Sequence, residues 1–216
     1  AEREFLTCGR NRISPEGLPE FFVKDIPPAS TGFPKITRPE IYYGESSNDY
    51  VFVKTRSQEL DYPSGDQNVY TTYQGRGGIP ISSTLTKLAL AARFGELKIL
   101  LSNDLTRESR IMIHRQITER VKQVAPFLRF DKDPYIVITD EGRLVWMIDG
   151  YTVTDRYPYS EPIRGVGNYI RNSVKATVDA YHGTLVFYMA DPSDPIIRTY
   201  AKAFPGLLKP MEEMPA

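Results

Sequence analysis

The side chains in this sequence that could do chemistry are mostly carboxylates. Asp131 and Asp133 flank a lysine, Asp149 ends an apolar run, and Asp155 opens the stretch DRYPYSEP. Loop carboxylates of this kind could hold calcium, and a spaced pair could serve a glycosidase as acid and base. A short carboxylate also accepts nearby backbone amides in ordinary turns, which favours a structural role. We therefore expect no metal site and no cofactor.

A second chemical candidate is the stretch GRGG at residues 75–78. Its exposed amides could cradle a phosphate, with Arg76 adding positive charge, although a flexible turn is the more ordinary interpretation. The sequence contains none of the strong motifs for acyl transfer, zinc hydrolysis or nucleotide binding. Of its two histidines, His114 is expected to pack on a helix and His182 to sit in a turn. An enzyme is accordingly the less favoured hypothesis.

Tyrosine is abundant and often has polar neighbours. The chain has 14 Tyr, and Tyr beside Asp or Arg is common in sugar-binding and protein-binding surfaces, although it also builds ordinary half-buried sheet faces. We lean towards binding. The residues predicted to form the binding surface are Tyr42, Tyr43, Tyr157, Tyr159, Asp155, Arg156 and Arg76.

Composition indicates an ordinary globular protein. The 216 residues balance 27 basic against 27 acidic side chains, so no net charge would attract nucleic acid. The single cysteine, Cys8, excludes an internal disulfide framework. No apolar run reaches the length of a membrane helix, and no signal peptide is expected. We predict one soluble domain over residues 1–216, cut from a longer protein, with an extended Pro-rich arm over residues 1–40.

The first half of the chain predicts two strands and then two helices. The strands are expected at residues 49–55 and 68–74, where β-branched and aromatic residues gather. A helix is expected to begin at Ser82 or Ser83 and to stop at Gly95, with Leu85, Leu88, Ala89 and Ala92 on one face. A second helix is expected to be capped by Thr106 and to end at Pro126, with His114 on its apolar stripe.

The second half predicts hairpins. Residues 135–139 and 144–153 form one, and residues 174–181 and 184–191 form another, whose alternation places Val174, Ala176, Val178 and Ala180 on a buried face. Asp194 and Pro195 are expected to start a last helix. The sequence therefore predicts an α+β fold, a largely antiparallel sheet built from hairpins with two or three helices packed on it.

Several segments of the sequence, occurring in the same order, resemble one known family. They include ITRPEIYYGE, RFGELKILLSND, RVKQVAPFLRFDKDPYIVI, TDRYPYSEP and NYIRNSVKATVDAY. From about Gly17 onwards the chain is similar to uncharacterised protein family 0182, large bacterial membrane proteins with a big extracytoplasmic region. One departure lies at Cys8–Ser14, where the family usually carries a further segment. The resemblance transfers no catalytic residue, because none is established for the family.

The resemblance implies a cellular location and a role for this chain. We expect a region of a cell-membrane protein on the extracytoplasmic side, acting as a ligand-binding or protein-binding module. Its expected partners are the transmembrane region of its own parent protein, an envelope component or a second copy. The alternative is an enzyme acting on envelope polysaccharide or lipid, with Asp131, Asp133, Asp149 or Asp155 as acid and base.

Overall fold

The computed structural model describes residues 23–30, 35–47 and 50–215. Its largest element is a six-stranded sheet in the order β13-β12-β11-β10-β8, with β9 also paired to β10. All neighbouring strands are antiparallel except β12 and β13, which are parallel. The strands are β8 (Arg129–Phe130), β9 (Tyr135–Ile138), β10 (Leu144–Thr154), β11 (Tyr169–Asp179), β12 (Leu185–Met189) and β13 (Leu208–Pro210).

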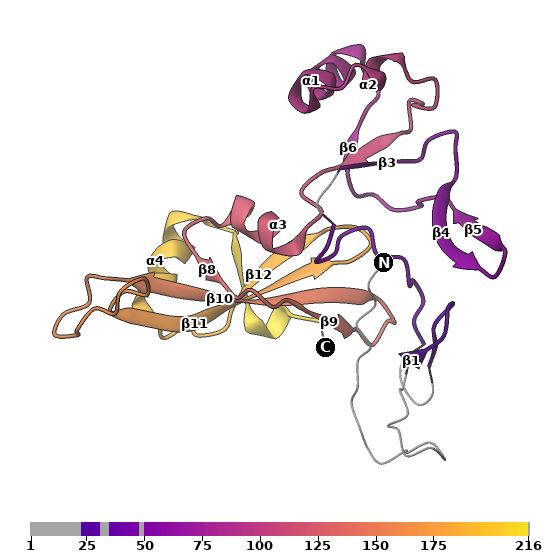
Figure 1. Cartoon of the computed structure of the whole chain (residues 1–216). Coiled ribbons are helices and arrows are strands. Elements are labelled where there is room, and N and C mark those ends of the chain that lie inside the picture. The colour runs from indigo at the N-terminus through magenta and orange to yellow at the C-terminus, as the bar shows by residue number, and fades with distance from the viewer. Residues whose placement is uncertain (1–22, 31–34, 48–49, 216) are drawn as a thin grey trace, which may run out of the picture.

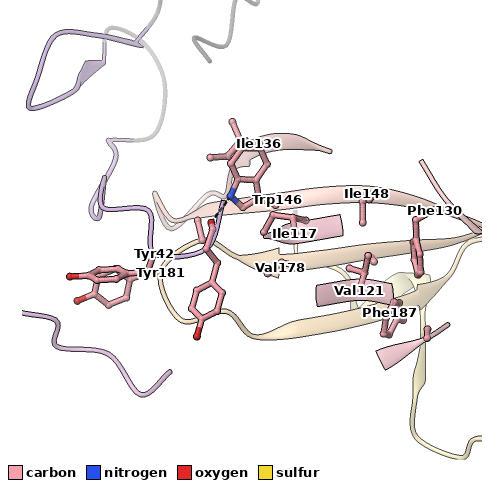
Figure 2. Close-up of a cluster of buried hydrophobic side chains, with 14 of the residues drawn as sticks. Tyr42, Ile117, Val121, Phe130, Ile136, Trp146, Ile148, Val178, Tyr181 and Phe187 are labelled. Carbon is pink, nitrogen blue, oxygen red and sulfur yellow. Dashed lines mark hydrogen bonds between the residues drawn. The ribbon is translucent and has the colours of Figure 1, made fainter. Parts of the chain in front are cut away.

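One face of this sheet carries the larger hydrophobic core. The register sets Trp146 opposite Val178 and Ile148 opposite Ala176. Two helices, α3 (Ile117–Val124) and α4 (Pro195–Ala203), pack on this face and lie along the sheet in Figure 1. Figure 2 shows Ile117 and Val121 of α3 next to the sheet residues, and all four residues of the predicted alternation are fully buried. Both predicted hairpins and the buried face are confirmed.

A smaller core lies in the part of the chain that precedes α3. The strands β3 (Val51–Val53), β6 (Ile79–Pro80) and β7 (Arg110–Met112) form a sheet in the order β3-β7-β6. The helices α1 (Thr84–Phe94) and α2 (Lys98–Leu101) stand at the end of the molecule away from the large sheet (Figure 1). This core is built from Ile81, Leu90, Ala91, Ile99 and Ile111.

Two short hairpins and a terminal turn complete the described structure. They are β1 (Val23–Lys24) with β2 (Ala29–Ser30), β4 (Glu59–Ser64) with β5 (Gln67–Thr71), and the 3-10 turn η1 (Met211–Glu213). Most of the expected Pro-rich arm, and the whole departure at Cys8–Ser14, lie outside the described residues. The α+β class is confirmed, and the prediction of a single domain stays a prediction.

The first predicted helix is confirmed, whereas the second is confirmed only in its C-terminal part, as α3, and its predicted start at Thr106 is wrong. Ser83 caps α1 by accepting the Thr86 amide at 3.1 Å, and Gly95 ends it at φ +69°. The region after Thr106 instead forms β7, because Arg110–Met112 pairs with β3 and its first two residues also pair with β6. His114 has a left-handed backbone, φ 49°, and α3 begins only after Gln116, whose side chain caps it. His114 is therefore not on a helix.

The helices of the described residues include none with the length and hydropathy of a membrane span.

The start of α4 is held by a buried carboxylate. Asp194 has no exposed surface, and it accepts hydrogen bonds from the Ile196 amide at 2.9 Å and the Tyr169 hydroxyl at 2.8 Å. The hydroxyls of Thr152 and Ser173 also donate to it. Burial acts to raise the pKa of Asp194, but these donors outweigh burial and hold the pKa below its ordinary value. The predicted cap is confirmed, and it links α4 to strands β10 and β11.

We predict that Asp194→Asn lowers the free energy of unfolding by about 2 kcal/mol at neutral pH, because a neutral amide replaces a carboxylate surrounded by donors. A lowered native pKa stabilises the fold above the ordinary Asp pKa of about 4, and this contribution is lost as the pH falls through the native value. Urea unfolding across that pH range should show the gap to the unmodified chain narrowing in acid. Asp133→Asn, at an exposed residue, is the control. A gap that is independent of pH would contradict the assignment.

Candidate functional site

The segment before β3 joins the chain's first half to the large sheet. The amides of Tyr42 and Tyr43 both donate to the carbonyl of Ala180, just beyond β11, at 2.9 Å each. The Trp146 Nε1 donates to the Tyr43 carbonyl at 2.9 Å, and the Arg115 Nε donates to the Tyr42 carbonyl at 2.7 Å. Four hydrogen bonds to and from its backbone therefore fix this segment against the end of the sheet.

The Tyr43 ring fills the space beneath this segment. It is 1% exposed, and the Arg120 guanidinium lies 4.6 Å from its centroid. A Cβ at Gly183 would lie 2.4 Å from the ring, so only glycine allows this close approach, and its φ of +70° also favours glycine. Burial raises the pKa of the Tyr43 hydroxyl, although Arg120 opposes the shift. Tyr43 is a core residue.

The Tyr42 ring belongs to a cluster of three tyrosines. Its centroid lies 4.7 Å from that of Tyr73 and 5.3 Å from that of Tyr181, and Figure 2 shows Tyr42 beside Tyr181. Burial raises the pKa of Tyr42, and the hydrogen bond to Glu59 raises it further. Burial also raises the pKa of Tyr73 to about 12. Tyr42 and Tyr43 are therefore both buried, 9% and 1% exposed, and their binding role stays a prediction.

The Glu59 carboxylate, on β4, ties three parts of the chain together. It accepts the Tyr42 hydroxyl at 2.7 Å, the Tyr73 amide at 2.7 Å and the Lys54 amide at 3.0 Å. These donors come from the segment before β3, the residues after β5 and the end of β3. Glu59 therefore holds the β4–β5 hairpin to the rest of the molecule.

A hollow of about 550 Å³ opens beside this junction. Its volume is in the range of small-molecule sites. Residues that line it and carry the argument below are Glu40, Tyr42, Phe52, Glu59, Arg115 and Trp146. Glu40 is notable because its Oε2 atom is buried and has no hydrogen-bond partner in the described structure. A buried acceptor without a donor is costly, so a side-chain rotation that brings this carboxylate to a donor in the hollow would be favourable.

The other predicted binding residues lie elsewhere. Tyr157 is 46% exposed and stacks on Tyr169, while Tyr159 is fully exposed. Asp155 and Arg156 are exposed beside them, with a long ion pair of 3.9 Å. This loop joins β10 to the start of β11, whereas Tyr42 lies at the other end of β11, about 30 Å away for an eleven-residue strand. The structure does not bring the two groups into one site.

The GRGG stretch packs tightly against the second hairpin turn. The Arg76 amide donates to His182 Nδ1 at 3.4 Å and the Gly77 amide to the Tyr73 hydroxyl at 2.7 Å. A Cβ at Gly77 would lie 2.4 Å from the His182 carbonyl oxygen. Two of the amides expected to cradle a phosphate are thus already engaged, while the Arg76 side chain is exposed.

Of the four candidate catalytic aspartates, Asp131 and Asp149 are neighbours across β8 and β10, where the Asp131 amide donates to the Asp149 carbonyl at 2.9 Å. Asp149 binds Lys175 and accepts Asn172 at 3.0 Å, and Asp131 accepts the Lys132 amide at 2.6 Å. Asp133 and Asp155 are exposed. Within the described ranges no three acidic, Cys or His side chains are grouped so as to hold a metal.

Sequence reasoning named Tyr42 but missed the other residues that carry the description of the hollow. Glu40 lies in the segment ITRPEIYYGE, two residues before Tyr42, and this position was an available signal. Trp146 is the one tryptophan of the sequence. Glu59 carries no local signal, because its three donors come from separate parts of the chain.

Comparison with known proteins gives one family. The model described as "Uncharacterised protein family (UPF0182)" matches residues 5–216. The chain is 58% identical over 205 residues to a UPF0182 protein of Geotalea uraniireducens, and 59% identical over 206 residues to one of Geobacter sulfurreducens. Each alignment covers 95% of this chain and 23% of the relative. A relative in Pelotomaculum thermopropionicum is 52% identical over 205 residues, 95% of this chain and 22% of its own.

The chain therefore spans about a quarter of the length of these relatives (23% and 22%). No solved structure matches it.

We predict that Glu59→Gln lowers the free energy of unfolding by about 2 kcal/mol, since either orientation of the amide sets its NH₂ donor against another donor. Urea unfolding of the purified chain measures this loss. Asp66→Asn, in the exposed turn of the same hairpin, is the matched control and should change the value by less than about 0.5 kcal/mol. Equal stabilities of the two variants would show that Glu59 does not anchor the hairpin.

Proposed function

The chain belongs to uncharacterised protein family 0182, and from this premise we propose that it is a binding module of an integral membrane protein. In this proposal the module faces the extracytoplasmic side, and the membrane spans belong to the rest of the parent. The lengths are compatible with this arrangement, since the relatives extend far beyond the matched region. The module then lies beside the membrane region of its own parent.

The observation that carries the binding role is the buried, unpaired oxygen of Glu40 at the hollow. A carboxylate is an acceptor only, so its complement is a hydroxyl or an ammonium group. Glu59 and Asp61 also line the hollow, and Tyr42 and Trp146 supply aromatic surface beside them. Aromatic rings next to acceptors suit a small polar molecule with apolar edges. We assign the ligand to envelope components that carry hydroxyl or ammonium donors.

The exposed loop with Tyr157 and Tyr159 is a second surface in this proposal. It lies at the opposite end of β11 from the hollow, and Tyr159 there is fully exposed. We propose that it contacts a protein or an envelope component independently of the hollow.

Binding in the hollow can be followed through Trp146, because no other tryptophan contributes to the fluorescence. Glucosamine, which carries both hydroxyl and ammonium donors, is the probe, and we predict a saturable change in emission. Glu40→Gln should weaken this binding about tenfold, since it removes the charged acceptor. Glu96→Gln, at an exposed position after α1, is the control variant, and N-acetylglucosamine tests the role of the ammonium group. A linear response, or one unchanged by Glu40→Gln, would contradict the proposal.

The location is tested separately in the full-length parent. An alkaline phosphatase fusion placed next to Ala216 should be active, because this reporter folds only outside the cytoplasm. A fluorescent protein fused at the same site should then stay dark. The opposite pattern would place the module in the cytoplasm and end this part of the proposal.

A further inference from the structure

Helix α1 carries apolar side chains on two opposite sides. On its inner side Leu90 and Ala91 are buried, 7% and 5% exposed, in the smaller core. On its outer side Leu85 is 78% exposed and Leu88 54% exposed. We call this outer side the leucine face; it consists of Leu85, Leu88, Ala89 and Ala92, all of them exposed.

The spacing of the leucine face is that of a packing surface. Its residues follow the i, i+3, i+4, i+7 pattern of one helix stripe, which usually faces a core. Here that stripe faces outward, and the described residues leave it uncovered. The neighbouring helix α2 adds Leu97 at its start, 71% exposed, and Leu101 at its end, 79% exposed. Apolar groups gathered in this way usually mark a contact surface.

Cations border the leucine face. Residues 84–101 contain Lys87, Arg93 and Lys98 against one acidic residue, Glu96, which gives this segment a charge of +2. Arg93 and Lys98 are exposed, and Arg93 follows Ala89 by four residues, so it lies at the border of the face. The chain as a whole is neutral. The segment that carries the exposed apolar side chains is therefore locally positive in a neutral chain.

We propose that the leucine face is a membrane-contact surface that lies on an anionic lipid bilayer. The exposed leucines enter the boundary between headgroups and acyl chains, and Arg93 and Lys98 bind the lipid phosphates. At 11 residues α1 is too short to span a bilayer, so it lies in the plane of the surface. The position of α1 and α2 at one end of the molecule leaves them free to reach a flat surface (Figure 1).

The composition of the face favours lipid over a protein partner. Its four members are aliphatic, with no aromatic ring and no side-chain hydrogen-bonding group, whereas the centres of protein interfaces are enriched in Tyr, Trp and Arg. Leucine with bordering lysine and arginine is instead the composition of helices that lie at membrane surfaces. The proposal uses residues that do not line the hollow, so its test is separate from the test of ligand binding.

Flotation with lipid vesicles tests this surface. The chain should bind vesicles of phosphatidylglycerol and phosphatidylcholine and should bind pure phosphatidylcholine vesicles about tenfold more weakly, because the cations lose their partners. Leu85→Glu should weaken binding to the mixed vesicles by about tenfold, since a charge then enters the apolar layer. Val124→Glu, which changes a 49% exposed side chain in the last turn of α3, should bind like the unmodified chain. Circular dichroism confirms that both variants fold.

Three results would overturn the proposal. They are absence of vesicle binding, binding that Leu85→Glu leaves unchanged, and equal binding to neutral and anionic vesicles. Sedimentation of the chain without lipid tests the alternative that a second copy of the chain covers the leucine face. Self-association that Leu85→Glu abolishes, together with no vesicle binding, would assign the leucine face to a second copy.

Discussion

The structure depends on one carbonyl group, that of Ala180. It accepts two consecutive amides from the segment before β3, while its own amide donates to the Leu144 carbonyl at 3.0 Å. The end of β11 is thereby joined to β10 on one side and to the first half of the chain on the other. This pairing sets the Tyr43 ring on Gly183 and turns Tyr42 towards the other tyrosines. The wall of the hollow follows from that arrangement.

Elements with strong local signals could be predicted from the sequence. Asp194 followed by Pro195 specifies a helix start through nearby atoms alone, and alternation around Val178 specifies which side of a strand is buried. The segment after Thr106 could not be predicted in this way, because Ile111 fits a helical stripe as well as a strand. Its state is decided by pairing with β3 and β6, and both partners are distant in sequence. Non-local pairing overrides local periodicity here.

The candidate site shows the same limit. Tyr42 and Tyr157 have similar polar neighbours in the sequence, yet one is buried and the other is exposed at the far end of β11. Local composition cannot separate them, since burial depends on which strand end lies opposite each segment in the fold. Glu59 is a further case, because its role arises from three donors brought together by the fold. Helix α1 is the reverse case: its apolar stripe was predictable, but its outward direction was set by the positions of β6 and β7.

The β4–β5 hairpin has a consequence for motion. It is a two-stranded sheet paired with no other strand in the described residues, and such a unit is only marginally stable alone. In the described residues, the hydrogen bonds of Glu59 are the main polar contacts between the hairpin and the rest of the chain, and Glu59 also lines the hollow. Loss of the Glu59 hydrogen bonds would release the hairpin as a separate local unfolding unit, or foldon, while the six-stranded sheet stays intact. Amide hydrogen exchange in the hairpin would then report on occupancy of the hollow, because a ligand there stabilises the closed form.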